Sequence, residues 1–189
     1  MDTSILRKWD IRGIYPTQIN EEVASTIGYA YATYLKEKNI KDCIIGRDNR
    51  IGGELLSRCL ISALTDSGIN VTYLDLVTTP MLNFACHKLD INYGIMVTAS
   101  HNPKDDNGFK VFGDKCLHLE TSELNHLYDL IKEKKKEISN FKGFTKKVSI
   151  KDLYIKDLIS NINIGNKRLK VVIDSGNGTA STIIKDVYK

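Results

Sequence analysis

The stretch YGIMVTASHNPKDDNG, residues 93–108, joins an apolar run to a polar turn and decides how the fold is interpreted. The apolar residues of Tyr93–Ala99 are consecutive rather than alternating, which is typical of a strand covered on both faces. Ser100 follows where that strand should end, and ligands gather at the carboxyl ends of strands in open α/β sheets. The Asn-Pro and Asn-Gly pairs after it force turns whose free backbone N–H groups can face an anion. On local chemistry alone, a connecting turn without function and a phosphate-binding loop both stay open.

Helical and extended patterns alternate on the N-terminal side of this stretch. Apolar residues recur at helical spacing in three segments, and the runs between them favour strands. The alternation predicts an α/β fold, a three-layer α/β/α domain around a mostly parallel mixed sheet. The predicted elements are a helix from Val23 with Asn20 as N-cap, a strand at Asp42–Gly46, a helix at Gly53–Ser67 ended by Gly68, a strand at Asn70–Leu76, and a helix to about Lys88 with Thr79 as N-cap and Pro80 at its first position.

The rhythm changes on the C-terminal side, after Asn107. The segments FKVF and CLHL, on either side of GDK, predict a hairpin at a sheet edge, and Thr121 to about Lys136 is predicted to be a helix. Ser139–Lys147 has no periodicity, which is typical of a junction between domains.

A fresh α/β pattern begins after this junction. Ser149 and Asp152 have the spacing of a capping box, which predicts the start of a helix. Arg168–Ser181 then predicts a strand, a glycine turn and a helix start. We therefore expect a first domain at residues 1–147 and, at residues 148–189, the incomplete start of a second, similar domain.

Composition and charge exclude several classes of protein. With 42% hydrophobic and 26% charged residues, the 189-residue chain is globular in composition. No apolar run approaches the roughly 20 residues of a membrane-spanning helix, so no membrane contact is expected. The net charge is only +4, and the basic stretch Lys132–Glu137 contains glutamates and no aromatic for base stacking, so no nucleic-acid partner is expected. Four cysteines without a CxxC pair, and no secretory signal, predict reduced thiols and a cytoplasmic location.

Other chemistries fit the sequence less well than phosphate binding. No GxSxG elbow surrounds Ser100, which disfavours a hydrolase, and Pro103 at the first ligand position excludes an EF-hand. The arginines of GRDNR, Gly46–Arg50, could hold phosphate, but a structural ion-pair role is favoured. DSGNG, Asp174–Gly178, lacks a third Rossmann glycine and a P-loop lysine, so a tight turn is predicted. Three histidines outside the serine loop lack metal-ligand spacing and are expected to be structural or surface residues.

Taken together, the motifs resemble the α-D-phosphohexomutases, the family of phosphoglucomutase, phosphomannomutase and phosphoglucosamine mutase. GIMVTASHNPKDDNGFK, Gly94–Lys110, is similar to the family's phosphoserine signature, and WDIRG, Trp9–Gly13, to its N-terminal Y-D-I-R-G motif. GRD, TPML (Thr79–Leu82) and VIDSGNGTA (Val172–Ala180) fall in the family's order. The resemblance covers the whole chain, as the N-terminal part of such an enzyme.

The resemblance implies reversible interconversion of sugar 1-phosphates and 6-phosphates through a phosphoserine and a hexose 1,6-bisphosphate. Ser100 matches the phosphoserine, and its phosphate would be one ligand of a Mg²⁺ cofactor. Lys110 matches the general acid/base, Arg12 the active-site arginine, and His101 a neighbour of the serine that shapes the loop. The expected catalytic residues are therefore Ser100, Lys110, His101 and Arg12.

Substrate binding, of hexose phosphates and hexose 1,6-bisphosphate, is expected from Trp9, Arg12, Asn102 and Lys110. Trp9 stands where the family usually has tyrosine. The three metal-binding aspartates of the family's DGDxDR-like loop, its sugar-recognition loop and its last phosphate-binding loop have no counterpart in these 189 residues, so little activity is expected from them alone.

The family leaves more than one activity open. WDIRG and DSGNG favour a phosphomannomutase/phosphoglucomutase over a phosphoglucosamine mutase, whose N-terminal motif more often reads G-T-D-G-I-R-G. A non-catalytic sugar-phosphate-binding module that uses the same loop is the alternative of a different class.

Overall fold

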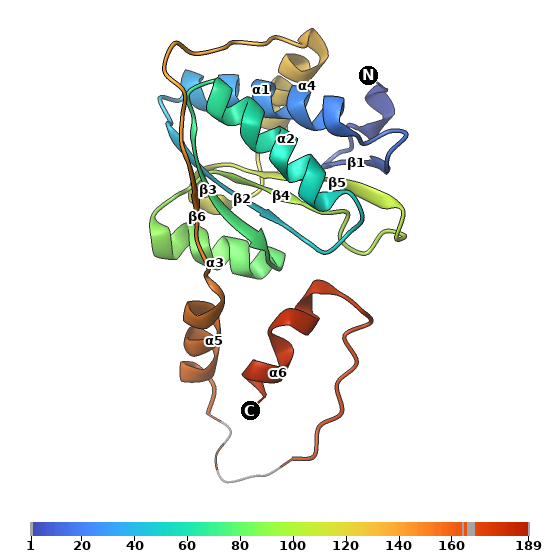
Figure 1. The fold of residues 1–189 in the computed structure, drawn as a ribbon, viewed down its shortest axis with the longest axis vertical. Coiled ribbons are helices and arrows are strands. Elements are labelled where there is room, and N and C mark those ends of the chain that lie inside the picture. The colour runs from blue at the N-terminus through green and yellow to red at the C-terminus, as the bar shows by residue number, and fades with distance from the viewer. Residues whose placement is uncertain (1, 164, 166–168, 189) are drawn as a thin grey trace.

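A computed structural model describes residues 2–163, 165 and 169–188 of the chain. Six strands form one sheet, and helices pack on its faces (Figure 1). The spatial order of the strands is β1-β5-β4-β2-β3-β6. Their bounds are β1 Ile11–Ile14, β2 Asp42–Arg47, β3 Asn70–Leu76, β4 Gly94–Val97, β5 Asp106–Phe112 and β6 Thr145–Lys147.

The sheet is mixed and mostly parallel, which confirms the predicted fold class. Strands β4, β2, β3 and β6 run parallel to one another, whereas β5 pairs antiparallel with both β4 and β1. Arg47, the last residue of β2, lies opposite Val97, the last residue of β4. The loops that follow these two strands therefore leave the sheet side by side, at its carboxyl edge.

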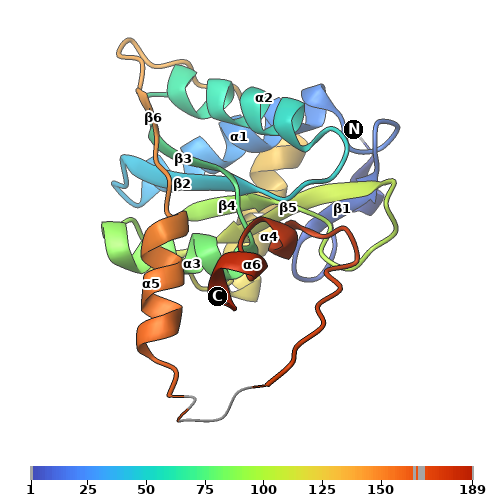
Figure 2. The same ribbon diagram turned by 60° about the horizontal axis from the view of Figure 1, so that its bottom comes forward.

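The helices form a layer on each face of the sheet (Figure 2). Helices α1, α2 and α4 cover one face, and α3 covers the other, with α5 packed against α3 through an edge-to-face contact between Tyr154 and Phe84 at 5.3 Å. This three-layer arrangement is the predicted one. The α-helices are α1 Glu21–Glu37, α2 Gly53–Asp66, α3 Thr79–Leu89, α4 Thr121–Glu133, α5 Lys151–Ser160 and α6 Ile184–Val187, and short 3₁₀ helices lie at Thr3–Ile5, Asp114–Cys116 and Thr179–Thr182.

Two buried clusters of side chains lie on opposite faces of the sheet. Ile45 and Ile95 pack into the cluster formed with α1 and α2, whereas their neighbours Ile44 and Met96 pack into the cluster formed with α3. Consecutive apolar residues in these strands therefore each have a core to enter, since neighbouring side chains of a strand point to opposite faces. This explains the uninterrupted apolar run of β4, and confirms that it is covered on both faces.

Helix ends agree with the sequence signals at two of three positions. The Asn20 side chain accepts a hydrogen bond from the Val23 N–H at 3.1 Å and caps α1, as predicted. Gly68 ends α2 with a φ of 88°, a left-handed conformation that favours glycine. The N-cap of α3 is Thr78 rather than Thr79, because the Thr78 hydroxyl oxygen accepts a hydrogen bond from the Met81 N–H at 3.4 Å.

The prediction of an edge hairpin after Asn107 was wrong. Strand β5 lies inside the sheet, between β1 and β4, and so is not an edge strand. The segment after it turns into a short 3₁₀ helix and returns only as far as one isolated bridge between Phe112 and His118. The segments FKVF and CLHL favour extended backbone, but they do not indicate which strands flank it.

The segment after α4 also departs from prediction. Ser139–Lys147, predicted as an aperiodic junction, ends in β6, which pairs with β3 and completes the edge of the sheet. All three residues of β6 are exposed, so no apolar alternation marks it. The capping box at Ser149 and Asp152 is absent, because α5 begins at Lys151 with Ile150 as a cap that makes no side-chain hydrogen bond.

The predicted strand within Arg168–Ser181 does not form. Arg168 lies outside the described residues, and residues 169–174 belong to no strand. Val172 is 92% exposed there. The glycine turn is confirmed, since Gly176 has a φ of 55° and the Gly178 N–H donates to the Ser175 carbonyl at 2.9 Å.

Among the described residues, no helix combines the length and the apolar character needed to cross a bilayer.

Cys43, Cys59, Cys86 and Cys116 are all free thiols, and three of them are buried. Burial raises the pKa of the Cys59 thiol above its ordinary value. The three buried thiols belong to the two buried clusters of side chains, Cys43 to one and Cys86 and Cys116 to the other.

Candidate active site

The serine loop begins directly after β4. Thr98 is buried, and its N–H donates to the Gly108 carbonyl of β5 at 2.9 Å. Its hydroxyl oxygen accepts the Ser100 N–H at 2.9 Å. Ser100 has a φ of 57°, in the left-handed region, and its side chain is exposed. The chain thus leaves a buried strand and presents a serine to solvent within three residues.

Arg50, from the loop after β2, holds the serine loop by its backbone. Its Nη2 donates to the carbonyls of Ser100 at 2.9 Å and Asn102 at 2.7 Å. Its Nη1 donates to the carbonyls of Pro103 at 2.6 Å and Asp106 at 2.9 Å. One guanidinium therefore gathers four carbonyl oxygens spread over seven residues.

Asp48 anchors this arrangement from the other side. The Thr98 hydroxyl donates to its Oδ2 at 2.5 Å, and the Arg50 backbone N–H donates to its Oδ1 at 3.1 Å. The Arg50 Nε lies 3.4 Å from the same carboxylate. The other arginine of GRDNR, Arg47, pairs with Asp75 at 2.8 Å. The ion-pair role predicted for these arginines is confirmed, and for Arg50 it is only part of what the residue does.

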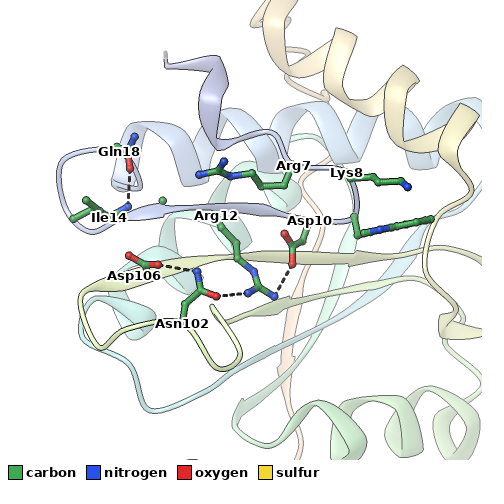
Figure 3. A pocket seen from close by; sticks show the side chains of 10 residues that line it. Arg7, Lys8, Asp10, Arg12, Ile14, Gln18, Asn102 and Asp106 are labelled. Carbon is green, nitrogen blue, oxygen red and sulfur yellow. Dashed lines mark hydrogen bonds and ion pairs between the residues drawn. The ribbon is translucent and has the colours of Figure 1, made fainter.

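Arg12 reaches the serine loop from β1. Its Nη2 lies 2.7 Å from Asp10 Oδ2, and its Nη1 donates to Asn102 Oδ1 at 2.7 Å (Figure 3). The Asn102 amide in turn donates to Asp106 Oδ2 at 2.8 Å. The Arg12 Nε is buried and has no hydrogen-bond partner among the described residues. A buried N–H without a partner is costly, so Arg12 retains a donor that a bound anion or water can satisfy.

These side chains border an open cavity of about 610 Å³. In Figure 3, Arg7 and Lys8 lie on one side, and Arg12 reaches from β1 to Asn102, which lies beside Asp106. Trp9 also lines the cavity and is 55% exposed, with the Lys8 ammonium 5.1 Å from its ring centre. Three cations and an exposed indole face suit a phosphorylated sugar, since aromatic faces pack against sugar rings and cations neutralise phosphate.

Lys110 lies on β5, opposite Met96 of β4. Arg12 lies opposite Gly108, two residues before Lys110, so Arg12 and Lys110 project from the same face of the sheet. Lys110 also acts on His118: partial burial lowers the pKa of that imidazole, and the lysine's positive charge lowers it further. The Lys110 ammonium therefore lies within electrostatic reach of a second titratable group on this face.

The described residues do not make a complete metal site. No group of three or more histidine, cysteine, aspartate or glutamate side chains in this part of the chain is arranged to hold an ion. The Asp48 carboxylate is linked to the Ser100 N–H through the Thr98 hydroxyl. It already accepts hydrogen bonds from Thr98 and from the Arg50 backbone, and it pairs with the Arg50 guanidinium. A divalent ion at Ser100 would find oxygen from a phosphate on that serine, but not a set of carboxylates.

The structure brings some of the expected residues together and leaves others apart. Trp9, Arg12 and Asn102 line one cavity, and Ser100 and His101 are exposed in the adjoining loop. Lys110 does not line that cavity.

Sequence reasoning missed the supporting contacts of Asp48, Thr98 and Arg50. The GRDNR stretch contains two of them, Asp48 and Arg50. A hydrogen bond to a backbone carbonyl, however, leaves no signature in the sequence of the segment that supplies the carbonyl. The cations Arg7 and Lys8 were missed as well, and their place directly before the WDIRG motif is the signal that could have found them.

The described geometry can be compared with known proteins. Residues 3–138 match the family described as phosphoglucomutase/phosphomannomutase, alpha/beta/alpha domain I. A phosphomannomutase/phosphoglucomutase of Pseudomonas syringae is 39% identical over 182 residues, which are 95% of this chain and 38% of that protein. A phosphomannomutase of Vibrio cholerae is 36% identical over 100% of this chain and 42% of its own length.

The solved structures give the same result. The chain superimposes on a phosphoglucomutase/phosphomannomutase family protein of Burkholderia thailandensis with a TM-score of 0.89 and 27% identity, over 100% of this chain and 42% of that one. The chain thus spans about two fifths of the length of these relatives.

Proposed function

The chain belongs to the phosphoglucomutase/phosphomannomutase family, and we propose that it is the phosphoryl-transfer part of a phosphohexomutase. The proposed reaction interconverts hexose 1-phosphate and hexose 6-phosphate, with mannose and glucose phosphates as the favoured substrates. The motifs WDIRG and DSGNG support these hexoses over glucosamine.

The reaction consists of two balanced phosphoryl transfers. A phosphoserine at Ser100 gives its phosphoryl group to a hydroxyl of the hexose monophosphate. The bond from phosphorus to the serine oxygen breaks and that oxygen takes up a proton, while the bond from phosphorus to the sugar oxygen forms and the sugar hydroxyl loses its proton. The resulting hexose 1,6-bisphosphate turns round and returns its other phosphoryl group to the serine, whose hydroxyl loses its proton as the released sugar oxygen gains one. The enzyme is regenerated, and the phosphate has changed position on the sugar.

One observation carries the proposal: an exposed serine at the carboxyl end of a buried strand, in a loop beside a cationic cavity. A phosphoserine carries about −1.5 to −2 charges at neutral pH, so a second phosphate approaches only where cations compensate. Arg7, Lys8 and Arg12 supply three positive charges at the cavity, against two from Asp10 and Asp106. The lining therefore has one positive charge in excess, which favours an anion in the cavity. The rest of the negative charge of two phosphates would have to be compensated by a bound cation.

The remaining residues take roles that their positions support. Lys110 acts as the general acid/base that takes and returns the hydroxyl proton, with Arg12 on the same sheet face. Asn102 and Trp9 bind and orient the sugar phosphate at the cavity. His101 follows the serine and shapes the loop next to it.

A Mg²⁺ ion is part of the proposal, with a phosphate oxygen on Ser100 as one ligand. Such an ion would neutralise charge on the transferred phosphoryl group. Since the described residues supply no set of carboxylates for it, we expect little net turnover from these 189 residues alone.

We also propose that residues 1–147 form a first domain and that residues 148–189 open a second unit. We further propose that the thiols are reduced and that the protein is located in the cytoplasm.

Intact-mass spectrometry tests the proposal directly. Incubation with glucose 1,6-bisphosphate and Mg²⁺ should add one phosphate to the chain, and excess glucose 6-phosphate should remove it. Ser100→Ala should abolish the adduct. Ser160→Ala, at the exposed end of α5, is the matched control and should leave it unchanged.

Three other outcomes would change the conclusion. A phosphate adduct that survives Ser100→Ala would place the chemistry on another residue. Saturable binding of the bisphosphate without any adduct on Ser100 would favour the sugar-phosphate-binding module instead. A preference for glucosamine phosphates in removing the adduct would favour the phosphoglucosamine mutase.

A further inference from the structure

Arg50 contacts the serine loop in an unusual way, through main-chain oxygens alone. Its two terminal nitrogens donate to the carbonyls of Ser100, Asn102, Pro103 and Asp106 at 2.6 to 2.9 Å. Its side chain is only 12% exposed. A guanidinium presents its donors in a fixed planar fork, which a lysine ammonium cannot reproduce. The contact therefore fixes the path of the loop over seven residues, whatever side chains the loop carries.

The same network holds Ser100 in a conformation that it would not adopt by default. A residue with a Cβ is strained at a φ of 57°, so its surroundings must maintain that conformation. The Ser100 carbonyl is held by Arg50, and its N–H by Thr98, whose hydroxyl donates to Asp48. Both backbone groups of Ser100 are thus connected to residues 48–50.

The loop at 48–50 is itself fixed on its other side. Asn49 Nδ2 donates to the Asn177 carbonyl at 2.8 Å, and the Thr179 hydroxyl donates to Asn49 Oδ1 at 2.9 Å. The Asn49 N–H donates to the Thr179 hydroxyl oxygen at 3.2 Å. Arg50 therefore grips the serine loop from a loop that has contacts on two sides.

We propose that Arg50, paired with Asp48, is a positioning residue that sets the backbone of the serine loop and directs the Ser100 hydroxyl toward its substrate. Arg50 has no role at the reacting atoms, because its donors are occupied by carbonyl oxygens. The inference deepens the proposed function and rests on it for what Ser100 does, but the grip on the loop can be measured without any substrate.

Hydrogen–deuterium exchange of the 189-residue chain, read by mass spectrometry, tests the grip. Two backbone N–H groups donate within the loop, that of Asn102 to the Ala99 carbonyl and that of Asp106 to the Pro103 carbonyl, each at 3.1 Å. Both should exchange slowly. In Arg50→Ala, exchange across residues 99–107 should rise about tenfold, because hydrogen bonds to a charged donor are lost. Exchange in β2 and β4 should stay as it was. Arg58→Ala, which removes an exposed arginine of α2 that pairs with Glu54, is the matched control.

Chemical rescue separates positioning from general damage to the fold. Guanidinium chloride far below denaturing concentrations should restore slow exchange in Arg50→Ala, whereas sodium chloride should not, because only guanidinium can replace the missing fork of donors. A merely destabilised protein would exchange faster in guanidinium. If Arg50→Ala fails to fold, Arg50→Lys takes its place, with the same loop-limited rise in exchange expected.

The inference is overturned by loop exchange that changes less than about twofold, by a rise spread equally over the sheet, or by guanidinium that speeds exchange. A second measurement follows the rate of phosphate uptake by Ser100. In Arg50→Ala this rate should fall, whereas the bisphosphate concentration that gives half of the maximal rate should stay the same. If the unaltered chain takes up no phosphate at all, the proposed function has failed, while the exchange result still decides the role of Arg50.

Discussion

Gly108→Ala should separate β1 from the rest of the sheet. Gly108 lies on β5 opposite Arg12, and its carbonyl accepts the N–H of Thr98 at the base of the serine loop. A Cβ built at Gly108 would lie 2.1 Å from the Ile11 carbonyl oxygen and 3.1 Å from the Arg12 Cα. Both atoms belong to backbone, so no side-chain rotation can relieve the contact.

The size of the effect follows from that overlap. A carbon normally approaches a carbonyl oxygen to about 3.3 Å, so β1 must move by about 1 Å. Overpacking costs about 1–3 kcal/mol where side chains can adjust, and here only a strand can move, so we expect a loss of about 3 kcal/mol in the free energy of unfolding. Because β1 is an edge strand, the remainder of the sheet should survive.

Urea unfolding measures the loss, with circular dichroism for the whole fold and the fluorescence of Trp9, the only tryptophan, for the end of the chain that carries β1. Gly53→Ala is the control, because the nearest atom to its Cβ would be 3.5 Å away. It should change the free energy of unfolding by less than about 1 kcal/mol. The reasoning fails if Gly108→Ala is destabilised by no more than this control, or if Trp9 and the bulk of the fold respond identically.

Three further changes probe other contacts. Tyr31→Phe removes a buried hydroxyl that donates to a β5 carbonyl at 2.7 Å, and should cost about 1–3 kcal/mol in thermal or urea unfolding without altering phosphate uptake. Lys110→Met removes the charge that helps to lower the pKa of His118, so that pKa should rise toward 6.5 in an NMR titration; an unchanged value would place the ammonium elsewhere. The hydrogen bond from Lys38 lowers the pKa of Glu123 below its ordinary 4.5, so this carboxylate stabilises the fold above that pH and loses its effect as pH falls through its lowered pKa. The stability gap between the unaltered chain and Glu123→Gln should therefore shrink on acidification, and a gap independent of pH would contradict the assignment.

The sequence predicts the centre of this fold better than its edges. The long helices and the buried strands have periodic apolar residues and local caps, such as Asn20 on α1, so local pattern and final structure agree. β1 and β6 have four and three residues, and the three of β6 are all exposed. Their conformation comes from pairing with β5 and β3, which are distant in sequence, and no local pattern encodes that pairing.

The failed strand at residues 169–174 shows the opposite error. Its β-branched residues favour extended backbone, but Val172 is 92% exposed and no described strand lies beside it. A strand requires a neighbour to accept and donate its hydrogen bonds. Composition predicts the conformation of such a segment, whereas only the rest of the fold can supply its partner.

The candidate site divides in the same way. Ser100, Arg12 and Lys110 are visible in the sequence because motifs mark them. Arg50 as the holder of the serine loop is not, because it recognises carbonyl oxygens, which every residue has. Its partners lie 50 to 56 positions away along the chain, and any sequence in the loop would offer the same four atoms.

That indifference to side chains has a consequence for how the loop can change. A grip on side chains would tie the identity of each loop residue to the shape of the loop. A grip on carbonyl oxygens leaves exposed residues such as Lys104 and Asp105 open to substitution, because the hydrogen bonds from Arg50 to the loop involve no side chain of the loop. Charge and contact surface at the mouth of the site can therefore be redesigned, by mutation or by an engineer, while the backbone that carries Ser100 keeps its course.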